Sequence, residues 1–220
     1  MGVDHPNQYE NLLFNYAIGL LDEAQHLIIS SHIMMSARAR EIVRSYEQLG
    51  GELLERECNP VKMRDCSLDK VLAHLDEEPE PEKHPCFEYF TQGMDLPDII
   101  THYLALQRRN PAWKNLYPGI KTYELALKCK QSRARFLKAE PERATPTHTH
   151  RGSEITLILE GAFSDQGKEY YKGELIIRDE NDEHTPKACP ERGCVCLMVS
   201  SKPVRLTGKL ARLLNPFIKI

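Results

Sequence analysis

The sequence carries little excess charge of either sign. Its 29 lysines and arginines against 32 aspartates and glutamates leave a net charge of −3. A protein that binds nucleic acid through its own attraction for phosphate has a clear basic excess, so we expect no direct nucleic-acid binding. With 220 residues, 41% of them apolar, the chain has an ordinary globular composition and room for one large domain or two small ones.

Long hydrophobic runs are also missing. The most apolar stretch, LIISSHIMM, is interrupted by two serines and a histidine and is far shorter than the roughly 20 residues that cross a bilayer. The first residues, MGVDHPNQYE, contain neither a basic segment nor an apolar core typical of a secretion signal. The sequence therefore predicts no membrane association and a cytoplasmic location.

The cysteines lack the pattern of a disulfide framework or of a zinc ribbon. There are seven, an odd number, and no two of them form a CxxC pair. Cys194 and Cys196 alternate in an apolar run, GCVCLMV, so a strand would place both thiols on one face. With Cys189 in the preceding loop they are candidates for a redox-reactive group, whereas the alternative is plain packing in a strand core.

The first half of the chain has helical periodicity. Apolar residues recur every three or four positions from Ala24 to Leu49, which predicts one long helix ended by Gly50-Gly51. A shorter amphipathic helix is expected before it over 9–21, and two more over 68–76 and 96–107. A charged, proline-rich segment over 77–85 reads as an exposed connection.

The second half has the pattern of strands and turns. Short runs such as TYELAL, ARFLKA, EITLIL, ELIIRD and VCLMVS are separated by Gly, Pro, Asn and Asp. Many short strands in about 110 residues are typical of a sandwich or barrel. We therefore predict an α+β chain divided by domains: an all-α bundle over 1–92, a connecting helix over 93–110 and an all-β domain over 111–220.

The strongest chemical signal is the segment THTHRGSEITLILEG. His148 and His150 alternate on a strand and share a face, Glu154 has the same parity, and His184 follows 30 residues later. Three imidazoles and a carboxylate suit one divalent metal ion, and zinc, iron, manganese, nickel and cobalt all accept such a set. We expect these four side chains to be its ligands, and no catalytic residue is assigned.

The spacing of these residues matches the two motifs of cupin barrels. The first runs His-x-His, Glu154 and then Gly161, and the second keeps the interval between Gly173 and His184. Other motif positions differ, since Glu142 stands where the first motif opens with glycine. The ligands are retained, so the sequence predicts a metal-binding barrel of the cupin type.

Over almost its whole length the chain resembles the ChrR-type anti-sigma factors, which consist of a helical domain followed by a cupin-like domain. The similarity lies in residues 15–32, 148–175, 184–186 and 193–199. The EGAFSD segment is a more specific match than the bare cupin spacing. It implies that the helical domain holds an ECF-type (extracytoplasmic-function) sigma factor away from RNA polymerase. The cupin-like domain would release that factor on an oxidative signal such as singlet oxygen. Zinc is the metal that the resemblance implies for the barrel.

The resemblance also implies a second zinc, bound in the helical domain by an early histidine and an HxxxCxxC motif. In this sequence the motif reads His32, Ser36 and Ala39, so only His5 and His32 remain of four ligands. Two imidazoles cannot form a closed structural zinc site. We therefore predict that the helical domain folds without zinc and that His32 is a buried histidine.

Two alternatives remain. A cupin dioxygenase would use the same ligands around iron, with Arg151 and Arg178 as the arginines closest in sequence to the motifs. A metal-dependent sensor could also act on a protein other than a sigma factor. For sigma binding, the candidate contact residues are apolar positions on the helices: Leu12, Leu13, Tyr16, Leu20 and Ile29. The alternative for each of them is a place in the core of the helical bundle itself.

Overall fold

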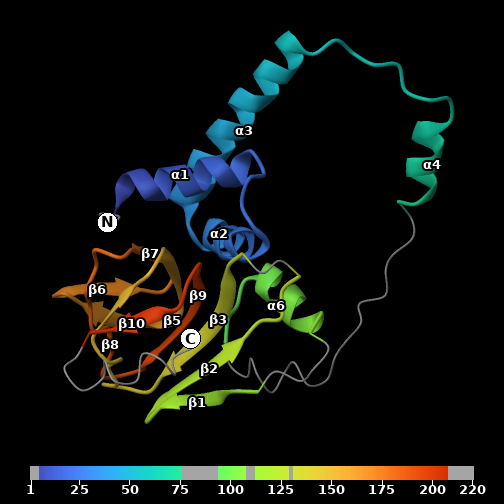
Figure 1. Ribbon diagram of the computed structural model, residues 1–220. Coiled ribbons are helices and arrows are strands. Elements are labelled where there is room, and N and C mark those ends of the chain that lie inside the picture. Colours follow the sequence, from blue (N-terminus) through green and yellow to red (C-terminus); the bar gives the residue numbers. More distant parts are fainter. Residues whose placement is uncertain (1–4, 76–93, 108–111, 129–130, 208–220) are drawn as a thin grey trace.

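The computed structural model describes residues 5–75, 94–107, 112–128 and 131–207. A helical part comes first and an antiparallel β part follows, as the sequence predicts (Figure 1). The helices are α1 (Pro6–Ala17), α2 (Glu23–Met35), α3 (Ala37–Glu57), α4 (Ser67–Ala73) and α6 (Asp98–Ala105). No helix within these ranges is long and apolar enough to cross a membrane.

The prediction of one long helix over residues 24–49 is wrong, because the chain breaks at Ser36. This residue has an extended backbone, and its Oγ accepts a hydrogen bond from the Ala39 amide at 3.3 Å, which starts a new helix. The second helix, α3, then runs through Gly50 and Gly51, where an added Cβ would meet no atom within 4 Å. The apolar periodicity continues across the break and therefore conceals it.

The strands are short except for β5. They are β1 (Lys114–Tyr117), β2 (Ile120–Glu124), β3 (Arg133–Ala139), β4 (His148–His150), β5 (Glu154–Asp165), β6 (Lys168–Tyr171), β7 (Leu175–Arg178), β8 (Lys187–Ala188), β9 (Cys194–Ser200) and β10 (Val204–Leu206). The main sheet has the order β1-β2-β3-β9-β5-β6, β7 and β8 also pair with β5, and β4 pairs with β10. All these pairings are antiparallel.

The glycine that closes the first cupin motif has a structural reason. Gly161 has a φ of +71°, and β5 changes register against β9 between Ile158 and Glu160. A Cβ at position 161 would collide with the carbonyl oxygen of Gly193. Only glycine combines this left-handed backbone with so close an approach of the neighbouring strand.

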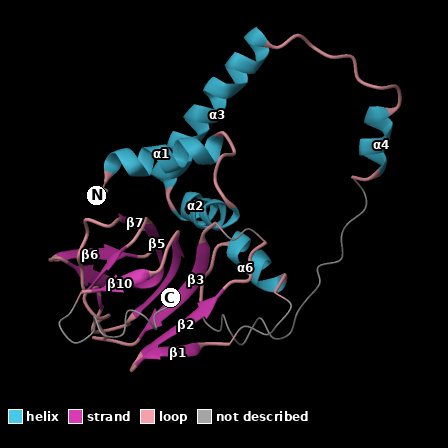
Figure 2. Ribbon diagram, in the orientation of Figure 1, coloured by secondary structure: helices cyan, strands magenta, loops and turns pink. Residues whose placement is uncertain are grey.

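The central strands are buried on both faces. One face contributes Phe136, Leu157 and Leu197 to a core shared with helices α1, α2, α3 and α6. The other face lines the barrel interior with residues such as Ile158 and Ile176. Figure 2 shows α2 and α6 lying against the sheet. Helices α1, α2, α3 and α6 and the outer face of the barrel therefore form one continuous hydrophobic core.

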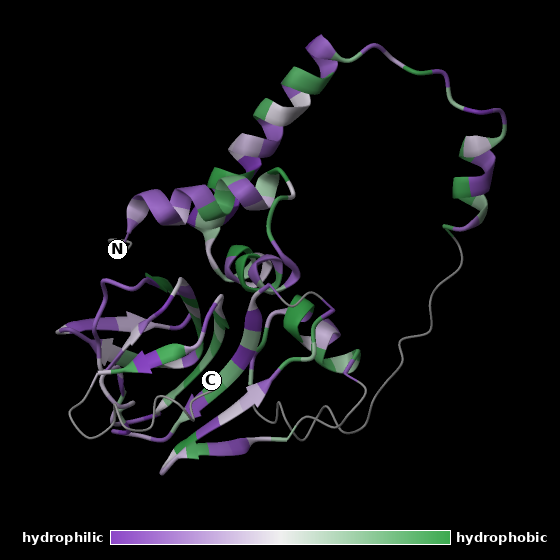
Figure 3. Ribbon diagram, viewed as in Figure 1, coloured by the Kyte–Doolittle hydropathy of each residue, from purple (hydrophilic) through white to green (hydrophobic). Residues whose placement is uncertain are grey.

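Part of the helical region has no such cover. The second half of α3 projects away from the rest of the described chain, and its apolar positions continue outward (Figures 1 and 3). Leu49, Leu53 and Leu54 are between 52% and 62% exposed, although they continue the stripe that begins with buried Ala39 and Val43. We call Leu49, Leu53 and Leu54 the open stripe of α3.

Candidate metal centre

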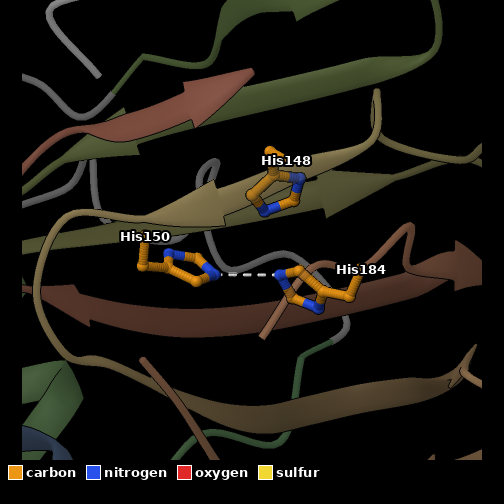
Figure 4. Close-up of side chains that lie close together, drawn as sticks. All are labelled: His148, His150 and His184. Atoms are coloured by element: carbon orange, nitrogen blue, oxygen red, sulfur yellow. Dashed lines mark hydrogen bonds between the residues drawn. The ribbon is translucent and has the colours of Figure 1, made fainter. Parts of the chain in front are cut away.

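Three of the predicted ligands come together inside the barrel. His148 and His150 lie on β4, and His184 lies in the segment before β8 (Figure 4). The backbones of His148 and His184 pair directly, with each amide donating to the other's carbonyl at 3.1 and 3.0 Å. All three side chains are buried, and one ring nitrogen from each lies within 4.8 Å of the others.

The orientation of the rings fits a bound cation. The Nδ1 of His148 donates to the carbonyl of Pro146 at 2.8 Å, and the Nδ1 of His184 donates to Asp165 at 2.9 Å. The Nε2 atoms of His148 and His184 therefore carry their lone pairs. The Nε2 atoms of His150 and His184 lie only 2.9 Å apart, where two lone pairs would repel unless a proton or a metal ion lies between them.

The protonation states agree with this. Burial, with smaller contributions from neighbouring charges, lowers the pKa of both His148 and His150 to about 4. Both rings are thus neutral near pH 7 and can donate a lone pair to a metal ion. The donor set of three imidazoles fits zinc as well as the other metals predicted from the sequence.

Glu154, the fourth predicted ligand, lies beside this cluster rather than within it. Its carboxylate is 4% exposed, and one oxygen is 3.6 Å from His150 Nδ1. Burial raises the pKa of this carboxyl group, whereas the nearby histidines and Arg135 lower it. The described group of three histidines does not include Glu154, so its role as a ligand stays a prediction.

Asp165 is a site residue that the sequence reasoning did not single out. Its Oδ2 accepts hydrogen bonds from His184 Nδ1 at 2.9 Å and from Arg178 at 3.1 Å, and the residue is 2% exposed. A carboxylate behind a ligating histidine fixes the ring and raises its basicity. The signal was present, because Asp165 ends the EGAFSD segment.

We expect Asp165→Asn to weaken metal binding by about 10- to 100-fold, the usual effect of losing such a carboxylate. Competition with a coloured chelator measures the affinity. Glu169→Gln, which changes an exposed carboxylate on the neighbouring strand, is the matched control and should bind as the wild type does. Equal affinities for Asp165→Asn and the control would contradict the role of Asp165.

The three candidate redox cysteines differ in their surroundings. Cys194 and Cys196 are buried in β9 and line the same cavity as the histidines, and Cys189 is half-buried in the loop before them. The hydrogen bond between the two β9 thiols, together with burial, raises the pKa of Cys196 well above its usual value. Such a thiol reacts slowly because little thiolate is present. The structure thus favours packing for this pair.

The two histidines left from the absent helical zinc motif take part in contacts with the barrel. His32 donates from Nδ1 to the carbonyl of Gly173 at 3.0 Å, and its Nε2 meets the Tyr9 hydroxyl at 3.0 Å. His5 lies at the start of α1 with its Nε2 3.3 Å from Asp182. No described metal-binding group contains either residue. His32 is buried, as the sequence analysis expects.

Stability should depend on pH through His32. Burial lowers its pKa to about 4 in the folded protein, whereas an unfolded histidine titrates near 6.5. Between these pH values the unfolded chain binds more protons than the folded chain. The free energy of unfolding is therefore highest above about pH 6.5 and falls by roughly 3 kcal/mol as the pH drops to about 4. Urea unfolding of wild type and His32→Gln should therefore give a shallower pH dependence for the variant. A His32→Gln curve parallel to that of the wild type, or a change equal to that of exposed His102→Gln, would argue against this.

Several predicted sigma-contact residues are unavailable. Leu13 and Ile29 are fully buried in the shared core, and Leu12 and Tyr16 are half-buried against it. Leu20 alone of the five is widely exposed, at 72%. For Leu13 and Ile29 the alternative, a place in the core, holds. Helical periodicity marks an apolar face without showing whether another element already covers it.

Known proteins are similar to this chain over both its helical half and its strand-rich half. The family of the ChrR cupin-like domain matches residues 102–205. The anti-sigma-E factor ChrR of Cereibacter sphaeroides is 33% identical over 214 residues, which cover 95% of each chain. A crystal structure of Rhodobacter sphaeroides SigE in complex with the anti-sigma ChrR matches with a TM-score of 0.68 and 31% identity, covering 87% of this chain and 96% of that one.

Proposed function

Because the chain belongs to the family of ChrR anti-sigma factors, we propose that it binds an ECF-type sigma factor and keeps it from RNA polymerase. The observation that carries this proposal is the similarity over the helical as well as the barrel half, to a relative whose structure was solved with its sigma factor. Since sigma factors act in the cytoplasm, the protein would act there too.

The exposed apolar residues supply a surface for this partner. The open stripe of α3 continues a covered core stripe into solvent, as expected of a helix face that packs against another protein. Helix α4 adds four exposed apolar side chains on a segment with no buried residue: Leu68, Val71, Leu72 and the adjoining Leu75. We infer that the sigma factor packs against the open stripe and α4.

The barrel would hold one divalent ion, and kinship with ChrR favours zinc. We propose His148, His150 and His184 as ligands, with Glu154 as the fourth. When bound, the ion supplies positive charge that joins β4 to the segment before β8. Asp165 orients the His184 ring, and burial keeps the His148 and His150 imidazoles neutral for binding.

A route from this centre to the helices supports a role in sigma release on oxidative stress. The turn at residues 179–182 directly precedes His184. Its Asp179 accepts a hydrogen bond from Gln8 of α1 at 3.3 Å, and Asp182 lies 3.3 Å from His5. A change that displaces His184 would therefore disturb contacts with the first helix. We propose the metal centre as the receptor of the signal.

We propose a helical domain over residues 1–92 and a barrel domain over 111–220, joined by a connecting helix over 93–110. The helices share a hydrophobic core with the outer face of the barrel, so the full chain is the appropriate material for binding experiments.

The test is co-expression of the tagged full chain with each ECF sigma factor of its own organism, followed by gel filtration. A stoichiometric complex that blocks transcription by that sigma factor supports the proposal. If no sigma factor associates, the cavity beside the histidines favours a metal-dependent dioxygenase instead, which iron content and oxygen uptake would reveal.

A further inference from the structure

The barrel interior contains a cavity of about 100 Å³ next to the histidines. Most of its wall is apolar and includes Leu137, Ile176 and Met198. His148 and His184 lie in the same wall. A mostly apolar cavity can hold a ligand with a small apolar body if a polar group is placed to fix its orientation.

Charged side chains line this cavity in unequal numbers. Three arginines, Arg135, Arg143 and Arg178, stand against two carboxylates, Glu154 and Asp165. A divalent cation on the histidines would add further positive charge. The cavity therefore favours an anion over a neutral or cationic molecule.

Arg135 is the residue within this wall that can hold an anion. It is 7% exposed, and its one hydrogen bond within the described part of the chain goes from Nη2 to Ser200 Oγ at 2.9 Å. The described residues place no carboxylate within 4.0 Å of its guanidinium, and the carboxylates of Glu154 and Glu124 act on it only from a greater distance. A guanidinium has five N–H donors. Burying one without a hydrogen-bonded carboxylate costs free energy, and a bound anion would reduce this cost.

The other two arginines differ from Arg135. Arg178 already donates to Asp165 at 3.1 Å and to the Tyr170 hydroxyl at 2.9 Å. Arg143 is exposed and lies at the outer side of the cavity, where its side chain crosses Gly119. Arg143 can attract an anion to the entrance. Arg135 is buried and, unlike Arg178, has no carboxylate within 4.0 Å among the described residues.

We propose that the cavity binds a small monocarboxylate with a short aliphatic body, its carboxylate paired with Arg135 and its body packed against Leu137, Ile176 and Met198. This deepens the proposed function, because a small acid would act on the same barrel that holds the metal. Only this regulatory role of the acid rests on the proposed function. Binding itself is a property of the free protein and can be measured without a sigma factor.

In the experiment, the metal-loaded full chain is titrated with straight-chain monocarboxylates from propionate to octanoate and with alcohols of the same length. Binding is measured by calorimetry and by the shift in melting temperature. Saturable binding of an acid, with the alcohol of equal length about 10-fold weaker or more, is expected. Arg135→Gln should weaken the acid by about 10- to 100-fold. Arg133→Gln, which changes an exposed arginine of the same strand, should bind as the wild type does.

A second variant keeps the test decisive if Arg135→Gln does not fold. Leu137→Ala enlarges the cavity and should shift the preferred acid to a longer chain. No saturable binding of any acid, equal binding of acids and alcohols, or an unchanged length preference in Leu137→Ala would overturn the proposal. None of these results depends on the sigma complex, so a failure here is distinct from a failure of the anti-sigma function.

Discussion

Replacing Leu49 and Leu53 together by glutamate should weaken the sigma complex by about 100-fold or more. Both side chains are more than half exposed in the free protein, so the substitution leaves the shared core intact. Burial of one leucine contributes about 1.5–3 kcal/mol, and a glutamate in its place would also have to lose water without a partner. Interface energy concentrates in a few such residues.

The measurement is titration of the sigma factor with the tagged variant, read by calorimetry or gel filtration. Glu55→Lys is the matched control, because it changes an exposed charged residue on another side of the same helix turn. It should alter affinity by a few-fold at most. If the double variant bound as tightly as the control, with an unchanged circular dichroism spectrum, the open stripe of α3 would not be the contact surface.

The second large effect concerns the metal. His148→Ala with His150→Ala should reduce the bound metal from one ion per chain to nearly none, because one remaining histidine cannot hold an ion at this position. A ligand present at about 1,000 times its dissociation constant stabilises a folded protein by roughly 4 kcal/mol. The barrel of the variant should therefore unfold at a clearly lower temperature than the metal-loaded wild type.

Metal content by mass spectrometry and melting curves with and without a chelator measure both effects. His102→Ala, which removes an exposed histidine of α6, should keep its metal and its chelator response. Retention of one ion by the double variant would place the site elsewhere. In the double variant the helices and the open stripe should still bind the sigma factor, since their contacts do not include the replaced rings.

Much of the architecture follows from the sequence. Alternation placed His148 and His150 on one face of a strand, and the interval to His184 matched a known motif. These are local properties of a period-two chain, so they can be read without coordinates. Gly161 and Gly173 likewise occupy left-handed backbone positions, which glycine adopts without strain.

Other features depended on contacts between distant residues. The break at Ser36 was hidden because α2 and α3 share one apolar period on either side of it. Asp165 was missed because its importance comes from His184 and Arg178, which lie 19 and 13 residues away in the chain. All residues of β7 are buried, and so are those of β9 except Met198, which shows that both faces of these strands are covered. The sequence does not say which helix covers them.

The sequence by itself determined the order of a helical and a strand-rich half, the three histidines and the absence of the cysteines of a helical zinc motif. Only the tertiary structure decided that His5 and His32 contact the barrel, that Leu13 and Ile29 are covered whereas Leu49 and Leu53 are not, and that Arg135 lines a cavity. The reason is physical: periodicity fixes which residues share a face, whereas coverage and pairing depend on what packs against that face.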